Sequence, residues 1–264
     1  MAEKQINIAI AYDFDWTLAS CDMAETSLLP SLGLVAKEFW KEVNETTRQQ
    51  EMDPILSYLY MLIKKSEEKG VSLTKESLKE CGKNLPYFNG VEEYFSKINK
   101  YAESKGVKLD HYVISSGNKE IIEGSLIAKE FKKIYACSFK FDKNGIAEWP
   151  GITVNYTGKT QFLFRINKGI ENAWDNSEIN KYVERDKRPM PFENMIYLGD
   201  GETDVPAMTL LKQEGGHSIA VYAPERPKPN DLLTDGRVNY VTEADYSEDS
   251  ELFSIIKDII KKAC

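Results

Sequence analysis

Two aspartates one residue apart, Asp13 and Asp15, directly follow an apolar run near the start of the chain. Carboxylates this close repel each other, which raises the pKa of at least one of them unless a cation lies nearby. Ser115 and a second pair of aspartates, Asp200 and Asp204, directly follow two other apolar runs. Such side chains can act as nucleophiles, proton donors or metal ligands, so their positions in the fold decide whether they form a site.

Each of these polar groups follows a short apolar run that is typical of a buried strand. Such runs predict strands over residues 6–12, 110–117, 193–201, 217–224 and 237–245. Segments with helical spacing alternate with these strands, which predicts an α/β fold with a Rossmann-like parallel sheet flanked by helices. A Lys-Asn-Gly sequence predicts a β-hairpin over residues 137–156.

The stretch between the first two predicted strands contains no strand pattern. It consists of amphipathic segments, among them "PILSYLYMLIKKSEEKG" and "GVEEYFSKINKYAESKG". We therefore expect an all-helical subdomain over residues 21–106, inserted into an α/β core that is formed by residues 1–20 and 107–264.

The carboxyl ends of parallel strands meet at one edge of the sheet, so the aspartates and Ser115 are expected to converge there. Several carboxylates in one place need a cation, and oxygen ligands without histidine or cysteine suit Mg²⁺, which binds through a few carboxylates together with phosphate. A carboxylate can also act as a nucleophile and form an acyl phosphate. A second carboxylate can protonate the leaving oxygen and then activate water.

Four segments resemble the motifs of the haloacid dehalogenase (HAD) superfamily of phosphatases. The segment "DFDWTL" matches the first motif, DxDx[TV]L, and "YVISSG" is similar to the second, an apolar strand that ends in serine or threonine. The segment "GKTQFL" resembles the lysine motif, and "YLGDGETD" is similar to the acidic GDxxxD motif. The motifs occur in the order of the family and cover roughly residues 6–18 and 109–245.

This resemblance implies catalytic and metal-binding roles for the matching acids. Asp13 would be the nucleophile that becomes phosphorylated, and Asp15 would be the general acid and base. A Mg²⁺ ion would be held by Asp13, by the backbone carbonyl of Asp15 and by Asp200, with Asp204 at the metal or just behind it.

The resemblance also implies a phosphate site. Ser115 would donate a hydrogen bond to the transferring phosphoryl group, with Ser116 and Gly117 beside it. Lys159 would pair with both the phosphate and the nucleophile and stabilise charge in the transition state. Lys168 is a second candidate for this lysine, because the distance in sequence from Lys159 to the acidic motif is long for a compact member of the family.

The helical insertion resembles the C1 cap of the phosphoserine-phosphatase-like branch of the superfamily. Caps of this kind close over the phosphate site and contact the leaving group. Phosphoserine phosphatases use a glutamate and an arginine of the cap for the amine and carboxylate of the substrate. Glu25, or Asp22, and Arg48 are the candidates here, although their spacing does not reproduce the phosphoserine pattern closely.

The expected function is a Mg²⁺-dependent phosphomonoesterase that acts on a small phosphorylated metabolite through an aspartyl-phosphate intermediate. Phosphoserine phosphatase specifically, and a phosphotransferase or phosphomutase, remain as alternatives. A protein that binds a phosphate ester on the same fold without catalysis is the alternative outside enzymes. The presence of Asp15 disfavours a dehalogenase, which lacks this second aspartate.

Composition excludes other classes of protein. The formal net charge of −8 over 264 residues is spread along the chain, which disfavours nucleic acid and anionic membranes as partners. No apolar run approaches the roughly 20 residues that a membrane span needs. The N-terminus does not resemble a signal peptide, and the four cysteines are far apart in sequence, as in a reduced protein of the cytoplasm.

Overall fold

The computed structural model describes residues 5–264, so that residues 1–4 of the predicted core segment lie outside the described chain. A seven-stranded sheet has the order β4-β3-β2-β1-β5-β6-β7, and every neighbouring pair is parallel except β3 and β4. The strands are β1 (Ile6–Tyr12), β2 (Val107–Asn118), β3 (Lys133–Phe141), β4 (Ala147–Ile152), β5 (Met195–Gly199), β6 (His217–Tyr222) and β7 (Tyr240–Glu243). The predicted α/β class with a Rossmann-like sheet is confirmed.

The central strand β1 sets the position of the site. Its residues from Ile8 to Tyr12 are all buried, as the continuous apolar run predicts for a strand that is covered on both faces. Tyr12 pairs with Val113 of β2 on one side and with Leu198 of β5 on the other. The polar residues that follow these three positions therefore come to the same level at the carboxyl edge of the sheet.

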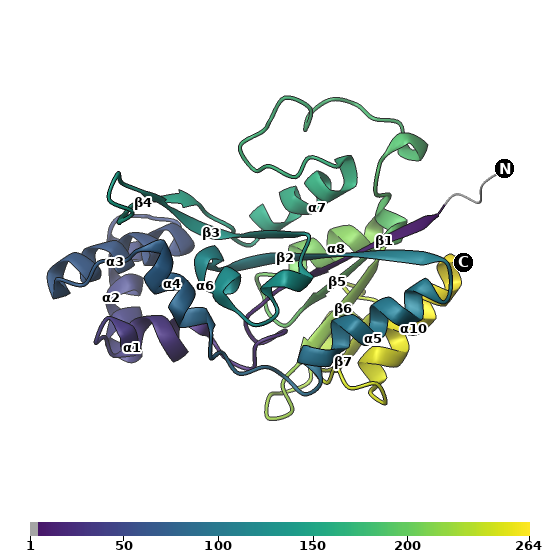
Figure 1. Cartoon of the computed structure of the whole chain (residues 1–264), viewed down its shortest axis with the longest axis horizontal. Coiled ribbons are helices and arrows are strands. Elements are labelled where there is room, and N and C mark those ends of the chain that lie inside the picture. The colour runs from purple at the N-terminus through teal and green to yellow at the C-terminus, as the bar shows by residue number, and fades with distance from the viewer. Residues whose placement is uncertain (1–4) are drawn as a thin grey trace.

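Helices cover both faces of this sheet (Figure 1). On one face lie α5 (Val91–Glu103) and α10 (Glu251–Ala263), and on the other lie α7 (Gly158–Lys168) and α8 (Val205–Gln213). The buried residues of α10 recur at helical spacing, with Leu252, Phe253, Ile256, Ile259 and Ile260 on its inner side. Shorter elements are α6 (Lys119–Gly124), α9 (Asn230–Thr234) and the 3₁₀ turns η2 (Ala128–Glu130), η3 (Arg185–Lys187) and η4 (Phe192–Asn194).

A group of helices lies beyond the carboxyl ends of the central strands, on the left of Figure 1. It consists of the π-helical turn η1 (Ala24–Leu28), α1 (Leu29–Ser31), α2 (Ala36–Gln49), α3 (Pro54–Lys69) and α4 (Lys75–Gly82). Its two connections to the sheet run side by side, because Ser20 N–H donates to Pro86 O at 3.0 Å and Phe88 N–H donates to Leu18 O at 3.1 Å. We infer that residues 21–86 form the cap.

The helix α5 does not belong to this group, although the predicted insertion of residues 21–106 includes it. It contacts β2 and α10, and the hydroxyl of its buried Tyr94 lies 3.0 Å from that of Tyr12 in β1. The sequence alone places α5 with the cap because it is amphipathic like its neighbours. Its apolar side is buried on the sheet, so the proposed boundary of the cap moves from residue 106 to residue 86.

Two elements differ from their sequence-based expectation. The helical pattern after the second strand ends early, at Gly124, because the backbone of Lys79 in α4 packs against that glycine and Ser125 is extended. The strand β3 begins at Lys133, well before the predicted hairpin, and its first part pairs in parallel with β2. The hairpin itself is confirmed, with Gly145 at φ 79° in its turn.

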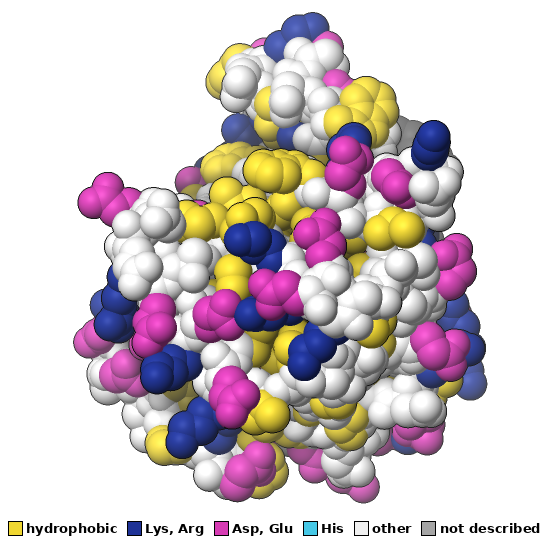
Figure 2. All heavy atoms as spheres, turned by 90° about the vertical axis from the view of Figure 1, so that its left-hand side faces the viewer, with side chains coloured by type: hydrophobic (Ala, Val, Ile, Leu, Met, Phe, Trp, Pro, Cys, Tyr) yellow, Lys and Arg dark blue, Asp and Glu magenta, His cyan; other side chains and the backbone are white. Residues whose placement is uncertain are grey.

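The face that carries the helical group and the β4 hairpin bears acidic and basic side chains of both signs, interspersed (Figure 2). Apolar side chains gather mainly near the top of this view, with smaller patches elsewhere. Among the described residues, no helix has both the length and the apolar character that crossing a membrane requires.

Candidate active site

Side chains from three adjacent strands and two helices meet at the carboxyl edge of the sheet. Asp13 follows β1, and its N–H donates to Leu198 O of β5 at 2.8 Å. This bond fixes the backbone at the start of the loop that contains DFDWTL, residues 13–18, which we call the motif loop. Ser115 lies near the end of β2, and Asp200 follows β5. Because β2, β1 and β5 are neighbours in the sheet, the predicted convergence of these residues is found in the structure.

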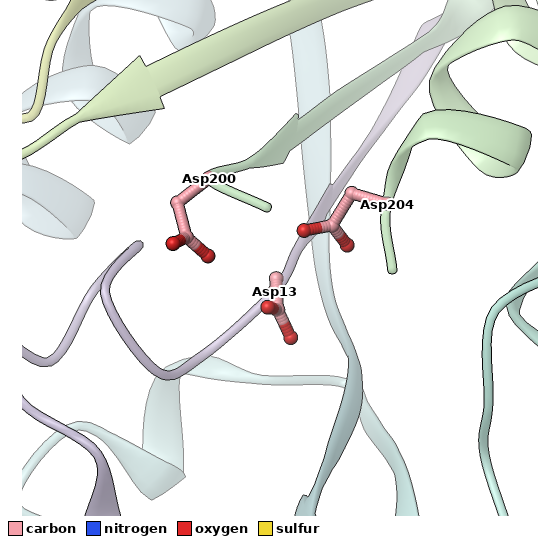
Figure 3. Close-up of side chains that lie close together, drawn as sticks. All are labelled: Asp13, Asp200 and Asp204. Carbon is pink, nitrogen blue, oxygen red and sulfur yellow. The ribbon is translucent and has the colours of Figure 1, made fainter. Parts of the chain in front are cut away.

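Three carboxylates form an acidic cluster at this edge: Asp13, Asp200 and Asp204 each offer an oxygen, and these oxygens lie within 4.8 Å of one another (Figure 3). Burial and the charges of Asp13 and Asp204 raise the pKa of Asp200 to about 8. Burial and Asp204 likewise raise the pKa of Asp13 to about 6, against the opposing effect of Lys159. A divalent cation would relieve this repulsion, so the donor set fits a metal with a preference for oxygen ligands.

Lys159 is the cation that the structure places inside this cluster. It is fully buried in the first turn of α7, and its Nζ lies 3.0 Å from Oδ1 of Asp13 and 2.7 Å from Oδ1 of Asp204. Although burial lowers the pKa of Lys159, the charges of the two aspartates outweigh this effect and hold it above the ordinary value. The lysine therefore stays protonated beside the position of the predicted nucleophile.

The alternative lysine lies elsewhere. Lys168 is at the other end of α7, where its Nζ donates to the carbonyl oxygens of Ile179 and Lys181 at 2.5 and 2.6 Å. These bonds hold the loop that follows the helix. Of the two lysines that the sequence left open, only Lys159 reaches the acidic cluster.

Asp204 is bound by donors of the protein itself. Its Oδ1 accepts hydrogen bonds from Lys159 and from the Tyr197 hydroxyl, the latter at 2.6 Å, and its Oδ2 accepts from Gly201 N–H at 3.2 Å. A side chain at position 199 would collide with Asp204, since a Cβ there would lie 2.4 Å from its Cγ, so Gly199 permits this approach. These contacts hold Asp204 on the fully buried side of the cluster, where it positions Lys159, whereas Asp13 and Asp200 are more open.

Asp15 lies on the side of the motif loop that faces the helical group. Its Oδ1 accepts a hydrogen bond from Met23 N–H at 3.0 Å. Burial, followed by the charges of Asp22 and Asp13, raises the pKa of Asp15 well above its ordinary value. A raised pKa favours the protonated carboxyl, which is the form that can donate a proton to a leaving oxygen.

The last residues of β2, where its pairing with β3 shifts register between Ser115 and Asn118, lie beside Asp15. The Ser115 Oγ accepts a hydrogen bond from Gly117 N–H at 3.0 Å, and the Ser116 Oγ is buried without a hydrogen-bond partner in the described chain. A Cβ at Gly117 would lie 2.5 Å from the side chain of Met23 and 3.2 Å from Oδ2 of Asp15, which explains the glycine. The buried Ser116 hydroxyl is a donor that an oxyanion at this end of β2 would satisfy.

These groups surround a cavity of about 320 Å³. The wall at the edge of the sheet contains Asp13, Asp15, Ser115, Ser116, Gly117 and Asp200. Lys159 and Asp204 do not line the cavity and are fully buried. Its other wall comes mainly from the motif loop and the cap, with Trp16, Asp22, Met23, Trp40, Val43, Asn44, Ile55 and Tyr58. Of the described residues that line it, none is a lysine or an arginine.

Two predicted substrate residues do not reach this cavity. Glu25 and Arg48 are both exposed, and neither lines the cavity wall. Arg48 lies near the end of α2, where the helix turns its charged side to solvent, so its rarity in this part of the sequence does not indicate a binding role. Asp22, the other acid that the sequence suggested, does line the cavity.

Sequence reasoning missed the aromatic part of the wall. Trp16 directly follows Asp15, and the structure places it at the cavity. Trp40 and Tyr58 come from α2 and α3, and their ring centroids lie 5.6 Å apart. Nothing in their helical spacing distinguishes them from core residues. A larger groove of about 590 Å³ between α2, α3 and β4 contains none of the predicted site residues.

Comparisons with known proteins agree with this geometry. The model of a family described as "Putative Phosphatase" matches residues 8–218. A protein of Borreliella burgdorferi, described as "Uncharacterized protein", is 32% identical over 287 residues, which cover 98% of this chain and 99% of that protein. The human pyridoxal phosphate phosphatase PHOSPHO2 is 24% identical over 224 residues, which cover 79% of this chain and 80% of that enzyme.

The fold has solved counterparts as well. A substrate-bound phosphoserine phosphatase superposes with a TM-score of 0.59 at 15% identity, over 97% of this chain and 99% of that one. The family match and the fold place the protein among the phosphatases of the HAD superfamily, with a helical cap region. Within it, the chain belongs to the Putative Phosphatase family. It is similar in sequence to PHOSPHO2, and its fold is similar to that of phosphoserine phosphatase.

Proposed function

We propose that this phosphatase is a Mg²⁺-dependent phosphomonoesterase that acts on a small phosphorylated metabolite through a phosphorylated Asp13. The observation that carries the proposal is the contact of Asp13 with Lys159 at 3.0 Å inside a cluster of three carboxylates. Asp13 and Asp200 would hold the Mg²⁺ ion, together with the backbone carbonyl of Asp15. When bound, the ion would screen the repulsion between the nucleophile and the anionic phosphate.

In the first half of the reaction, a carboxylate oxygen of Asp13 attacks phosphorus and the bond from phosphorus to the ester oxygen breaks. Asp15 gives its proton to that oxygen, so the leaving group departs as a neutral alcohol. Lys159 and the Ser115 hydroxyl stabilise the charge that spreads over the phosphoryl oxygens in the loose transition state.

In the second half, water hydrolyses the phosphorylated Asp13. The ionised Asp15 now accepts a proton from the water as its oxygen attacks phosphorus, and the bond between phosphorus and the Asp13 oxygen breaks. Phosphate leaves, Asp13 is a carboxylate again and Asp15 is protonated again. Ser116 and Gly117 complete the proposed phosphate site at the end of β2.

The side chains that line the cavity favour an aromatic substrate over phosphoserine. Phosphoserine carries an amine and a carboxylate, and the described residues that line the cavity include no basic side chain to bind the carboxylate. Trp16, Trp40 and Tyr58 instead offer aromatic surfaces. The related human enzyme PHOSPHO2 is a pyridoxal phosphate phosphatase, and pyridoxal phosphate is therefore our second, more specific candidate for the substrate.

A panel of phosphorylated metabolites with added Mg²⁺ tests the proposal. The panel contains pyridoxal phosphate, phosphoserine and para-nitrophenyl phosphate, and phosphate release is measured before and after addition of EDTA. We expect release from at least one ester, loss of that activity with EDTA and its return with excess Mg²⁺. Release from none of the esters, or activity that EDTA leaves unchanged, would contradict the proposal. Release accompanied by transfer to an added alcohol would instead favour a phosphotransferase.

A further inference from the structure

Arg226, in the loop between β6 and α9, contacts two residues of the site although no motif of the sequence includes it. Its guanidinium carbon lies 3.7 Å from the centroid of the Trp16 ring. Its Nη1 lies 3.5 Å from Oδ2 of Asp200. A planar guanidinium that stacks on an indole and pairs with a carboxylate is restrained in two directions at once.

Trp16 has an unusual backbone. Its φ of 55° lies in the left-handed region, where Glu51 is the only other non-glycine residue of the described chain. A bulky aromatic residue seldom adopts this conformation, which costs free energy and persists where the surroundings enforce it. The turn directs the ring to the cavity wall directly after Asp15. Arg226 contacts that ring, so it contributes to its position.

The loop that carries Arg226 is restricted by its sequence. Pro224 precedes this arginine and Pro227 follows it, and a residue before proline avoids the helical region. The N–H of Arg226 donates to Ala223 O at 2.9 Å, and Ala223, the residue directly after β6, is buried. The backbone of the arginine is thus fixed by the loop, independently of its contacts with Trp16 and Asp200.

We propose that Arg226 is a positioning residue for Trp16, and that Trp16 contacts the leaving group and determines selectivity for planar, aromatic leaving groups. This inference rests on the proposed function, because it assigns the contacts of the leaving group in the same cavity. Trp16 lines the same cavity as Trp40 and Tyr58 of the cap, and as Ser115, which would hold the phosphate.

The alternative is that Arg226 acts only through Asp200. In that case the removal of Arg226 would alter the acidic cluster and weaken the binding of all phosphate-like ligands to the same extent. If it acts through Trp16, its removal lowers the affinity for ligands that carry an aromatic ring and leaves the affinity for ligands without a ring unchanged. The two mechanisms therefore differ in a ratio of affinities, which binding measurements can give without turnover.

The test uses two ligands that cannot be hydrolysed, phenylphosphonate and methylphosphonate, whose dissociation constants are measured by calorimetry with Mg²⁺ present. We expect R226A to weaken phenylphosphonate about fivefold, in line with the loss of one cation–π contact. Methylphosphonate binding should change less than about twofold. R226K should behave like R226A, since lysine keeps the charge near Asp200 but not the planar stack.

A double-mutant cycle shows whether Arg226 acts through Trp16. W16A should weaken phenylphosphonate at least as much as R226A does, and W16A/R226A should be no weaker than W16A alone. The matched control is R237A, because Arg237 is half-exposed in an ion pair with Asp235 outside the cavity. It should leave both affinities unchanged.

Three results would overturn the inference: equal weakening of both phosphonates in R226A, full recovery in R226K, or additive effects in the double variant. A wild-type protein that does not prefer phenylphosphonate would overturn it as well. The proposed function fails separately. If the wild type binds phenylphosphonate selectively and R226A reduces that selectivity, but no phosphate ester is hydrolysed, the proposed function is wrong and the role of Arg226 stands.

Discussion

At the scale of single residues, the site depends on a buried lysine between two carboxylates. Lys159 lies within 3.0 Å of Asp13 and 2.7 Å of Asp204, and all three side chains are largely removed from solvent. Breaking such a network leaves an uncompensated buried charge, which is costly. The same contact orients the proposed nucleophile and lowers its pKa relative to an aspartate without a cation. Stability and catalysis are therefore coupled at this residue.

Replacing Lys159 by methionine, which is similar in length but uncharged, should affect both properties. We expect K159M to lose about 3 kcal/mol of unfolding free energy because two carboxylates lose their buried partner. Turnover should fall about 100-fold or more because charge in the transition state loses a stabilising cation. The matched control is K168M, whose lysine binds only loop carbonyls and whose activity should stay within about twofold. Normal turnover in K159M together with loss in K168M would reverse the assignment of the two lysines.

The site residues that the sequence predicted from the ends of strands lie together in the structure. Asp13 and Asp200 follow β1 and β5, and Ser115 lies near the end of β2, so the periodicity of the sequence sufficed to bring them together. Glu25 and Arg48 were chosen from the cap by residue type, and both turned out to be exposed. The direction of a side chain on a helix of the cap depends on how that helix packs on its neighbours, which its own sequence does not specify.

At the scale of elements, the cap and the sheet meet at a close crossing of two helices. In α4, a Cβ at Gly82 would lie 2.0 Å from Ile121 O, and in α6 a Cβ at Gly124 would lie 1.9 Å from Lys79 O. Both contacts are with backbone, which cannot move aside as a flexible side chain does. This crossing also ends α6 after six residues, which explains why the helical pattern of the sequence continued too far.

Alanine at either glycine should push these helices apart. We expect G124A and G82A each to lower the unfolding free energy by about 1–3 kcal/mol or more, as for other overpacked contacts. Chemical denaturation gives this value from the midpoint and slope. The control is G201A, because nothing lies within 4 Å of a Cβ at Gly201 and its φ is ordinary. Stabilities of G124A and G82A that equal that of G201A would show that the two helices do not cross this closely.

At the scale of the whole molecule, a buried polar cluster joins the central strands to α5. The hydroxyl of Tyr12 lies 3.0 Å from both the Tyr94 hydroxyl and Nδ1 of His111, and Nε2 of His111 lies 2.9 Å from Oδ1 of Asn99. This cluster ties together segments that are about a hundred residues apart in sequence, and no local pattern reveals it. The cluster also supports the proposal that α5 is part of the α/β core and not of the cap.

The cluster makes stability depend on pH. Burial lowers the pKa of His111 to about 4, below the value of about 6.5 for an unfolded chain. The folded state therefore binds fewer protons than the unfolded state between these values, so the contribution of His111 is complete above about pH 6.5 and is lost as the pH falls toward 4. This loss amounts to about 3 kcal/mol of unfolding free energy.

The variant H111Q isolates this contribution. The raised pKa values of Asp13 and Asp200 act in the opposite direction, but they are present in both proteins and cancel in the difference. We expect wild type to lose about 3 kcal/mol more than H111Q between pH 7 and pH 4, as measured by denaturation with urea. Parallel pH profiles for the two proteins would mean that His111 titrates normally in the folded state.

The proposed phosphorylation of Asp13 is the central claim, and trapping the intermediate tests it most directly. The protein is mixed with Mg²⁺ and a phosphate ester that it hydrolyses. The mixture is quenched in acid, and the protein is digested and examined by mass spectrometry. We predict one phosphoryl group on the peptide that contains Asp13 and none in D13N, which should also lose turnover. With para-nitrophenyl phosphate, whose leaving group departs without a proton from Asp15, D15N should accumulate more of the phosphorylated peptide because the water-activating base is lost. A phosphoryl group on another residue, or turnover that survives in D13N, would contradict the account.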